Sequence, residues 1–263
     1  MKIAFGSDLH FEFGGARPSL EAIRDVDLLV LAGDIAKGRG GLHNEPLFIE
    51  YAKSYADELH IPVVTVLGNH ELYGEEYHAF LKASQSAAAE QDLVHFLENN
   101  AVVFDGVRVL GCALWTDFKL GDNEAIARQE AYNTVNDYKR ISIRNKGGGT
   151  RSLTPAETAG FNEVSRIFLE KELAVPFQGP TVVVTHFPPI FMSDPQYEGD
   201  ALSPYFCNGW QEKIESGVLS PDVWIAGHTH YSMAVTIGRT RIVSRQGGYP
   251  GELEPFEWGV IEI

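Results

Sequence analysis

The sequence contains little cysteine and no signal-like apolar run at its start, and each shortage excludes a class of protein. Only two of its 263 residues are cysteines, too few for a secreted scaffold held by disulfides. We expect Cys112, inside an apolar run, to be a buried thiol, and Cys207, after a polar loop, to be a half-exposed one. The N-terminal apolar run is too short for a signal peptide and ends at Asp8. These features predict a reducing, cytoplasmic location.

Positive charge and membrane-spanning segments are also scarce. The chain has 21 Lys and Arg residues against 36 Asp and Glu residues, a formal net charge of -15. Long nucleic acids bind largely through cations that neutralise their phosphates, so we expect none as a partner. No stretch approaches the roughly 20 apolar residues of a membrane helix, so we expect no membrane partner. A small anionic substrate stays compatible with this charge if metal ions attract it.

What remains is the composition of an ordinary globular protein, with 44% hydrophobic and 22% charged residues. No low-complexity tract, fixed-period repeat or linker rich in Pro, Gly or Ser divides it. A chain of this length fits one large core, so we expect a single domain over residues 1–263. The sequence leaves the oligomeric state open.

Strands and helices alternate in the first third of the sequence, a pattern typical of parallel strands joined by helical crossovers. We expect strands at 2–7, 28–32 and 63–67, with helices at 19–24, 46–59 and 75–90. Hairpin signals follow, since Asp105-Gly106 separates strands at 102–104 and 107–114. A second hairpin is expected at 234–237 and 241–244, and a last strand at 258–263.

The middle third is polar and helical. We expect helices at 122–138 and 155–173, the second opened by a capping box between Thr154 and Glu157. Between them, residues 144–151 form a basic segment that we expect to be a mobile loop. Two packed sheets with helices outside, an α/β fold of the four-layer α/β/β/α type with two mixed sheets, account for this order.

Five short polar segments each follow a stretch that we expect to be a buried strand. Ligand crevices of α/β sheets lie at the carboxyl ends of the strands, so these segments can converge on one pocket. All five contain residue types that bind divalent metals: Asp8-Leu9-His10, Gly33-Asp34, Gly68-Asn69-His70-Glu71, Thr185-His186 and Gly227-His228-Thr229-His230.

The chemistry of these segments suits a pair of metal ions. Two divalent ions roughly 3.5–4 Å apart neutralise a phosphoester and lower the pKa of a bridging water. Asp34 is the best candidate to hold both ions, because Gly33 before it lets the backbone come close. Asp8 and His10, two residues apart on an extended segment, would point to the same side.

His228 and His230 have the same spacing, and we expect Gly227 to supply the sharp turn before them. Asn69 offers a carbonyl oxygen and His186 an imidazole nitrogen. Nitrogen and oxygen ligands without thiolate favour two divalent transition-metal ions, with Mn, Fe, Zn and Ni all left open.

In its order and spacing, this set resembles the calcineurin-like metallophosphoesterase superfamily, over residues 8–230. The resemblance implies the α/β/β/α sandwich and a catalytic His70 that is not a ligand and assists the leaving oxygen or stabilises phosphoryl charge. It also implies two ions that share Asp34: Asp8, His10, Asp34 and His230 hold the first, and Asp34, Asn69, His186 and His228 hold the second.

The sequence differs from one branch of that superfamily, and the differences narrow the range of expected substrates. Protein Ser/Thr phosphatases carry Gly-Asp-x-x-Asp-Arg-Gly, whereas this chain has Lys37 where the second carboxylate is expected. The usual partner that orients the catalytic histidine therefore has no counterpart in this motif, and the arginines flanking both motifs are missing. The sequence is more similar to small bacterial phosphoesterases than to the phosphoprotein branch.

We therefore expect an enzyme that hydrolyses a small phosphodiester, with cyclic nucleotides among the candidates, by in-line attack of a metal-bridging hydroxide. A phosphomonoesterase acting on a small metabolite is the alternative. A non-catalytic scaffold of the same fold is a weaker one, because no ligand position is eroded.

Substrate contacts are less specified by the sequence. Segment 193–210, rich in Pro, Tyr and Phe, could form a lid over the metals or an interface between copies of the chain. Four further histidines lack ligand context: His43, His60, His78 and His95. Candidates for substrate contact are Lys37, Arg39, Asn136, Arg140 and Tyr249.

Overall fold

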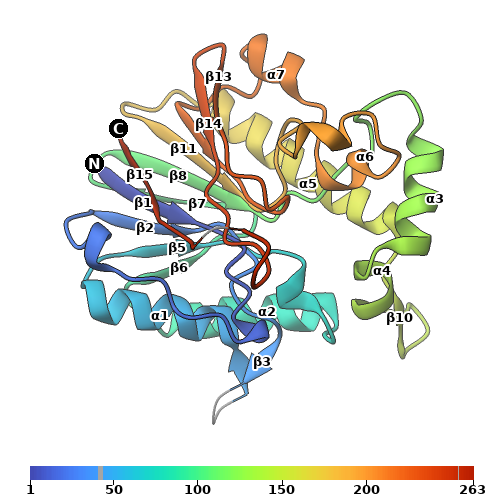
Figure 1. Ribbon diagram of the computed structural model, residues 1–263, viewed down its shortest axis with the longest axis horizontal. Coiled ribbons are helices and arrows are strands. Elements are labelled where there is room, and N and C mark those ends of the chain that lie inside the picture. Colours follow the sequence, from blue (N-terminus) through green and yellow to red (C-terminus); the bar gives the residue numbers. More distant parts are fainter. Residues whose placement is uncertain (41–43, 254) are drawn as a thin grey trace.

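Two β-sheets stack face to face at the centre of the computed structural model, which describes residues 1–40, 44–253 and 255–263 (Figure 1). The first sheet has the strand order β15-β1-β2-β5-β6, in which β15 alone runs antiparallel to its neighbour. Its strands are β1 (Lys2–Gly6), β2 (Leu28–Leu31), β5 (Val63–Thr65), β6 (Val94–Phe96) and β15 (Gly259–Glu262).

The second sheet has the order β13-β14-β12-β11-β8-β7. Its four inner strands are parallel, and each edge strand forms an antiparallel hairpin with its neighbour. Asp105 and Gly106 both have positive φ between β7 and β8, as a two-residue hairpin turn requires. The strands are β7 (Asn100–Phe104), β8 (Val107–Cys112), β11 (Thr181–Thr185), β12 (Val223–Ile225), β13 (Ala234–Ile237) and β14 (Thr240–Val243).

Helices cover the outer face of each sheet. Helix α1 (Leu47–Leu59) packs on β5 and β6 of the first sheet, and α2 (Tyr77–Ala89) packs on β6. On the second sheet lie α5 (Pro155–Ala174), whose Glu172 carbonyl accepts a hydrogen bond from Arg108 of β8, and α7 (Gln211–Glu215), which contacts β13. The predicted capping box of Thr154 and Glu157 opens α5.

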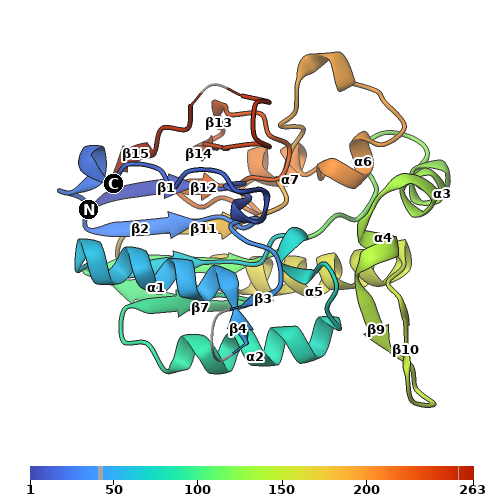
Figure 2. The same ribbon diagram turned by 60° about the horizontal axis from the view of Figure 1, so that its bottom comes forward.

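Most of the remaining elements gather at the end of the sandwich toward which the parallel strands point (Figures 1 and 2). They are α3 (Glu124–Thr134), α4 (Asp137–Arg140), α6 (Ser203–Phe206) and the small hairpin of β9 (Ser142–Arg144) with β10 (Thr150–Ser152). A second small hairpin, β3 (Arg39–Gly40) with β4 (Glu45–Pro46), lies beside α1 and α2. Short 3-10 turns complete the order: η1 (Phe11–Phe13), η2 (Glu21–Ile23), η3 (His70–Leu72) and η4 (Pro195–Tyr197).

Successive strand residues alternate between two apolar layers. Val30 and Val182 belong to a cluster built from both sheets, whereas their neighbours Leu29 and Val183 belong to the cluster that includes the helices. Each fully buried residue of this kind contributes about 1.5–3 kcal/mol through removal from water. The alternation confirms the predicted four-layer α/β/β/α arrangement of two mixed sheets.

Several local predictions were wrong. The segment 144–151 is not a loop throughout, because Arg144 pairs with Thr150 in the β9–β10 hairpin, and only residues 145–149 form the turn between the two strands. The helix expected at 19–24 is only the 3-10 turn η2, and the helix expected at 122–138 divides into α3 and α4. Strand β6 was not anticipated.

Cys207 is fully buried rather than half-exposed, and both cysteines are free thiols. His43 lies outside the described residues. Among the residues that the structure describes, no helix is both long enough and apolar enough to cross a bilayer.

Candidate metal centre and active site

The five polar segments meet at the carboxyl ends of β1, β2, β5, β11 and β12, so both sheets contribute to one site. A cavity of about 400 Å³ opens there. Asp34, Asn69 and His70 line it from the first sheet, and His228 and His230 line it from the second. Asp8, His10 and His186 lie beneath, fully buried.

Unusual backbone conformations place many of these side chains. Left-handed φ angles occur at Asp8 (54°), His10 (47°), Asp34 (52°), His228 (78°) and His230 (53°). Such a conformation costs a residue other than glycine about 1–2 kcal/mol. The prediction that Asp8 and His10 lie on an extended segment is therefore wrong, although both side chains reach the site. Strain gathered at one place is typical of a functional site.

Two glycines allow the loops to approach closely. A Cβ on Gly68 would lie 2.1 Å from Oδ1 of Asp34, and one on Gly227 would lie 2.7 Å from Oδ2 of Asp8. Gly227 therefore makes room for a carboxylate, and the positive φ of this turn occurs at His228 rather than at Gly227.

Asp8, His10 and His230 form one group of donor atoms. The Nε2 atoms of His10 and His230 are 3.0 Å apart, and Oδ1 of Asp8 is 3.6 Å from Nε2 of His230. The Nδ1 atoms point away, toward Glu12 at 3.2 Å from His10 and Glu252 at 2.7 Å from His230. A carboxylate on Nδ1 holds the proton there and leaves the Nε2 lone pair free for a metal.

Asp34, His186 and His228 form a second group. Nε2 of His186 lies 3.2 Å from Nδ1 of His228 and 3.2 Å from Oδ1 of Asn69. Nδ1 of His186 donates to the Ala32 carbonyl at 2.9 Å, which again leaves Nε2 free. The Asn69 amide nitrogen donates to Asp137, so its oxygen faces the site.

Asp34 lies between the two groups. Its Oδ2 is 3.8 Å from Nε2 of His10 in the first group and 3.5 Å from Nε2 of His186 in the second. Its Oδ1 accepts a hydrogen bond from the His70 amide at 2.8 Å. One carboxylate thus faces donors of both groups, as a shared ligand must.

The residues fit divalent metal ions. The converging atoms are oxygens and imidazole nitrogens without thiolate, which suits borderline and hard cations. Burial opposes protonation of His10, but its hydrogen bond to Glu12 and the charges of Asp34 and Asp8 outweigh burial and raise its pKa to about 9. The charges of Asp34 and Asp8 thus favour a cation at His10, whereas burial and the neighbouring His186 hold the pKa of His228 well below its usual range.

Glu71 connects the loops of this site and belongs to neither group of metal-binding side chains described above. It is fully buried, and it accepts hydrogen bonds from four backbone amides. These belong to Asp34, Ile35, Ala36 and Gly68.

His70 has a carboxylate partner that the sequence analysis missed. Its Nδ1 lies 2.9 Å from Oε1 of Glu12, and its Nε2 lies 3.2 Å from the Tyr249 hydroxyl. Burial opposes protonation of His70, but Asp34 and the bond to Glu12 raise its pKa. Glu12 thus supplies the carboxylate that orients His70, a role that the motif lacks because Lys37 takes the position of the usual acidic residue. The alternation Asp8, His10, Glu12 was the available signal.

The candidates for substrate contact separate into two sets. Asn136 and Tyr249 line the cavity, whereas Lys37, Arg39 and Arg140 are not among its described lining residues. Arg39 pairs with Glu75 at 3.1 Å, and the Arg140 guanidinium lies 5.5 Å from the centre of the Tyr73 ring. Segment 193–210 forms one wall of the cavity through Leu202, Tyr205 and Phe206.

The three other described histidines lie outside the cavity lining. His60 caps the C-terminus of α1, His78 is exposed on α2 and His95 belongs to β6.

Comparisons with known proteins agree with this geometry. The family model for calcineurin-like phosphoesterase matches residues 1–232. An uncharacterised protein of Acanthamoeba polyphaga mimivirus is 22% identical over 283 residues, with 97% of this chain and 93% of that protein covered. The crystal structure of phosphopantetheinyl hydrolase from Mycobacterium tuberculosis superposes with a TM-score of 0.65 at 18% identity, covering 95% of this chain and 90% of that one.

Proposed function

Because the chain belongs to the calcineurin-like phosphoesterase family, whose members are metal-dependent phosphoester hydrolases, we propose that it hydrolyses a small phosphodiester with two metal ions. The nearest alternative is a phosphomonoesterase. A non-catalytic scaffold is disfavoured, because every expected donor atom faces the site.

One observation favours a phosphodiester over a phosphomonoester as the substrate. Among the described residues that line the metal cavity there is no Lys or Arg, while Asp34 and Glu252 both contribute carboxylates. A phosphomonoester at neutral pH carries more negative charge than a diester, and an additional cation normally balances it. The protein lining offers no such side chain, which supports a singly charged diester.

The proposed ligands follow the two groups of donors. Asp8, His10, Asp34 and His230 would hold one ion, and Asp34, Asn69, His186 and His228 the other. When bound, two divalent ions neutralise the phosphate and make a water more acidic. We leave the metals as Mn, Fe, Zn or Ni.

His70 would act on the leaving oxygen. Glu12 accepts a hydrogen bond from the Nδ1–H of His70, so a protonated His70 directs its second N–H from Nε2 into the cavity, where Tyr249 lies. From there it could donate a proton to the departing alcohol. Asp137 contributes indirectly, because it holds the Asn69 amide with its oxygen toward the site.

The proposal treats residues 1–263 as one domain, since the donors come from both sheets. It includes a cytoplasmic location and small phosphate esters as the partners, and it does not depend on the oligomeric state. The name of the mycobacterial structure refers to a phosphopantetheinyl group, which makes a phosphopantetheinyl ester a further substrate to assay.

The test compares bis-p-nitrophenyl phosphate with p-nitrophenyl phosphate on protein supplied with Mn²⁺. We expect kcat/KM to favour the diester by roughly tenfold or more, about 1.4 kcal/mol of transition-state binding. His70→Ala and Asp34→Asn should abolish turnover, and His78→Ala, on the exposed face of α2, should not. Preference for the monoester would contradict the diesterase assignment.

A further inference from the structure

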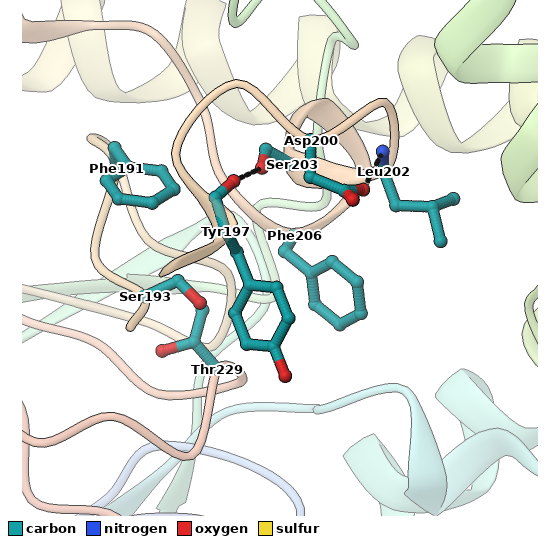
Figure 3. A pocket seen from close by; sticks show the side chains of 8 residues that line it. All are labelled: Phe191, Ser193, Tyr197, Asp200, Leu202, Ser203, Phe206 and Thr229. Carbon is teal, nitrogen blue, oxygen red and sulfur yellow. Dashed lines mark hydrogen bonds between the residues drawn. The ribbon is translucent and has the colours of Figure 1, made fainter. Parts of the chain in front are cut away.

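A second cavity adjoins the metal cavity and has no part in the roles assigned above. Its volume is about 310 Å³, and its walls include Phe191, Tyr197, Leu202, Phe206 and Thr229 (Figure 3). We call it the side pocket. Its size lies at the lower end of the range for small-molecule sites, enough for a group of the size of one aromatic ring.

The side pocket and the metal cavity share walls. Leu202, Phe206 and Thr229 line both. The Phe206 ring packs against the imidazole of His228, with ring centres 5.3 Å apart. A group attached to a phosphate at the metal centre therefore has a short path into the side pocket.

The side pocket is aromatic. Figure 3 shows the rings of Phe191, Tyr197 and Phe206 standing around the same hollow. Tyr197 is 51% exposed, although large aromatic side chains are usually well buried in proteins. Aromatic walls favour a flat ring, which can stack on them or meet them edge-on.

Most polar groups of the side pocket are already bonded within the protein. The Ser203 hydroxyl donates to the Tyr197 carbonyl at 2.5 Å, and the Thr229 hydroxyl donates to the Met192 carbonyl. Oδ1 of Asp200 accepts the Leu202 amide at 2.8 Å.

Asp200 is also the one charged residue among the described lining of the side pocket. An anionic group would meet this carboxylate without a neighbouring cation, and like charges repel. The lining therefore suits an uncharged group and disfavours an anionic one.

We propose that the side pocket binds an uncharged aromatic substituent of the phosphoester and so determines which esters the metal centre accepts. This inference rests on the proposed function. It deepens that function by naming the organic part of the substrate, and it assigns Tyr197 and Phe206 as residues that determine specificity.

The test measures binding of two phosphonates to the Mn²⁺-loaded protein by calorimetry. The monomethyl esters of phenylphosphonate and methylphosphonate each carry one negative charge, as a phosphodiester does, and they differ in the one substituent that would enter the side pocket. We expect the phenyl compound to bind about tenfold tighter, a modest effect for a filled apolar pocket. A carboxylate at the para position of the ring should remove that advantage, because it would face Asp200.

Substituted variants test whether the preference for the phenyl compound arises in the side pocket. Tyr197→Ala removes one wall, and Ser193→Phe fills the pocket that Ser193 lines; each should reduce the ratio of the two affinities to about threefold or less. Tyr132→Ala is the matched control, because Tyr132 is similarly exposed, at 46%, on α3 and lines neither cavity. It should keep the full ratio.

Equal affinities for the two phosphonates in the unaltered protein, or binding of neither, would overturn the inference. An advantage of the phenyl compound that survives both Tyr197→Ala and Ser193→Phe would also overturn it. Turnover of bis-p-nitrophenyl phosphate, measured in parallel, separates the two proposals. Turnover with equal affinities refutes the side pocket alone, and a phenyl preference without turnover refutes the catalytic function alone.

Discussion

Replacing Glu71 by alanine should destabilise the protein by about 4 kcal/mol. Oε2 of Glu71 accepts the amides of Asp34 (3.0 Å) and Gly68 (2.7 Å), and Oε1 accepts those of Ile35 (2.6 Å) and Ala36 (3.3 Å). Alanine leaves four buried amides without a partner, at about 1 kcal/mol each or more. The sum is a large part of the 5–15 kcal/mol that stabilises a typical domain.

Urea unfolding in the presence of EDTA measures this without a contribution from bound metal. With a slope of about 2.5 kcal/mol/M, the midpoint should fall by roughly 1.5 M. Glu71→Gln keeps one oxygen and two bonds and should lose about half as much. Glu257→Ala, at an exposed position, is the control and should shift stability by less than about 0.5 kcal/mol. If Glu71→Ala unfolds within about 1 kcal/mol of the unaltered protein, the carboxylate does not hold these loops together.

Three other substitutions test separate parts of the structure. Gly68→Ala places a Cβ 2.1 Å from Oδ1 of Asp34, so we expect at least a tenfold loss of Mn²⁺ affinity; normal affinity by calorimetry would show that the close approach is unimportant. Glu12→Gln weakens the hydrogen bonds to both His70 and His10, so it should lower kcat by about 10–100-fold at saturating Mn²⁺ while KM changes less than threefold; an unchanged kcat would remove Glu12 from the mechanism. Burial raises the pKa of Glu98 from 4.5 to about 7, so the folded state binds this proton more tightly than the unfolded state. The stability that Glu98 contributes is therefore present below pH 4.5 and lost as pH rises to 7, and Glu98→Gln should flatten that slope in urea titrations at several pH values; an unaltered slope would contradict it.

The position of the donor residues could be predicted because it depends on local patterns. Apolar runs ending in Asp, Asn or His identified the strand ends, and parallel strands bring their carboxyl ends to one edge. Asp8 in the first strand loop and His228 in the last are 220 residues apart, yet the His228 amide donates to the Asp8 carboxylate at 3.1 Å. The resemblance to a family supplied their expected roles.

Partners that depend on how loops pack could not be predicted. The alternation of Glu12 with Asp8 and His10 could single it out, but nothing in the sequence shows that it meets His70, which is 58 residues away. Asp137 likewise meets Asn69 only because α4 folds against the first sheet's loops. Arg39 seemed suited to a phosphate by charge alone, but Glu75 neutralises it.

The left-handed backbone was also beyond sequence reasoning. Neither Asp8 nor His10 requires positive φ, which residues other than glycine adopt only uncommonly. In the folded protein the amides of Asp8 and His10 donate hydrogen bonds to the carbonyls of Gly33 and Asp34 on the neighbouring loop. Tertiary hydrogen bonds therefore set the local conformation, and with it the direction of the ligands.

Metal content is the most direct test of the two-metal site. Elemental analysis after reconstitution with Mn²⁺ and removal of free metal should give about two ions per chain for the unaltered protein, since the proposed ligands belong to two of the groups of donors that meet there. His186→Ala should retain fewer, and His78→Ala, which replaces an exposed histidine of α2, should retain the full content. A chain that binds no divalent metal, or an equal content in all three proteins, would contradict the account.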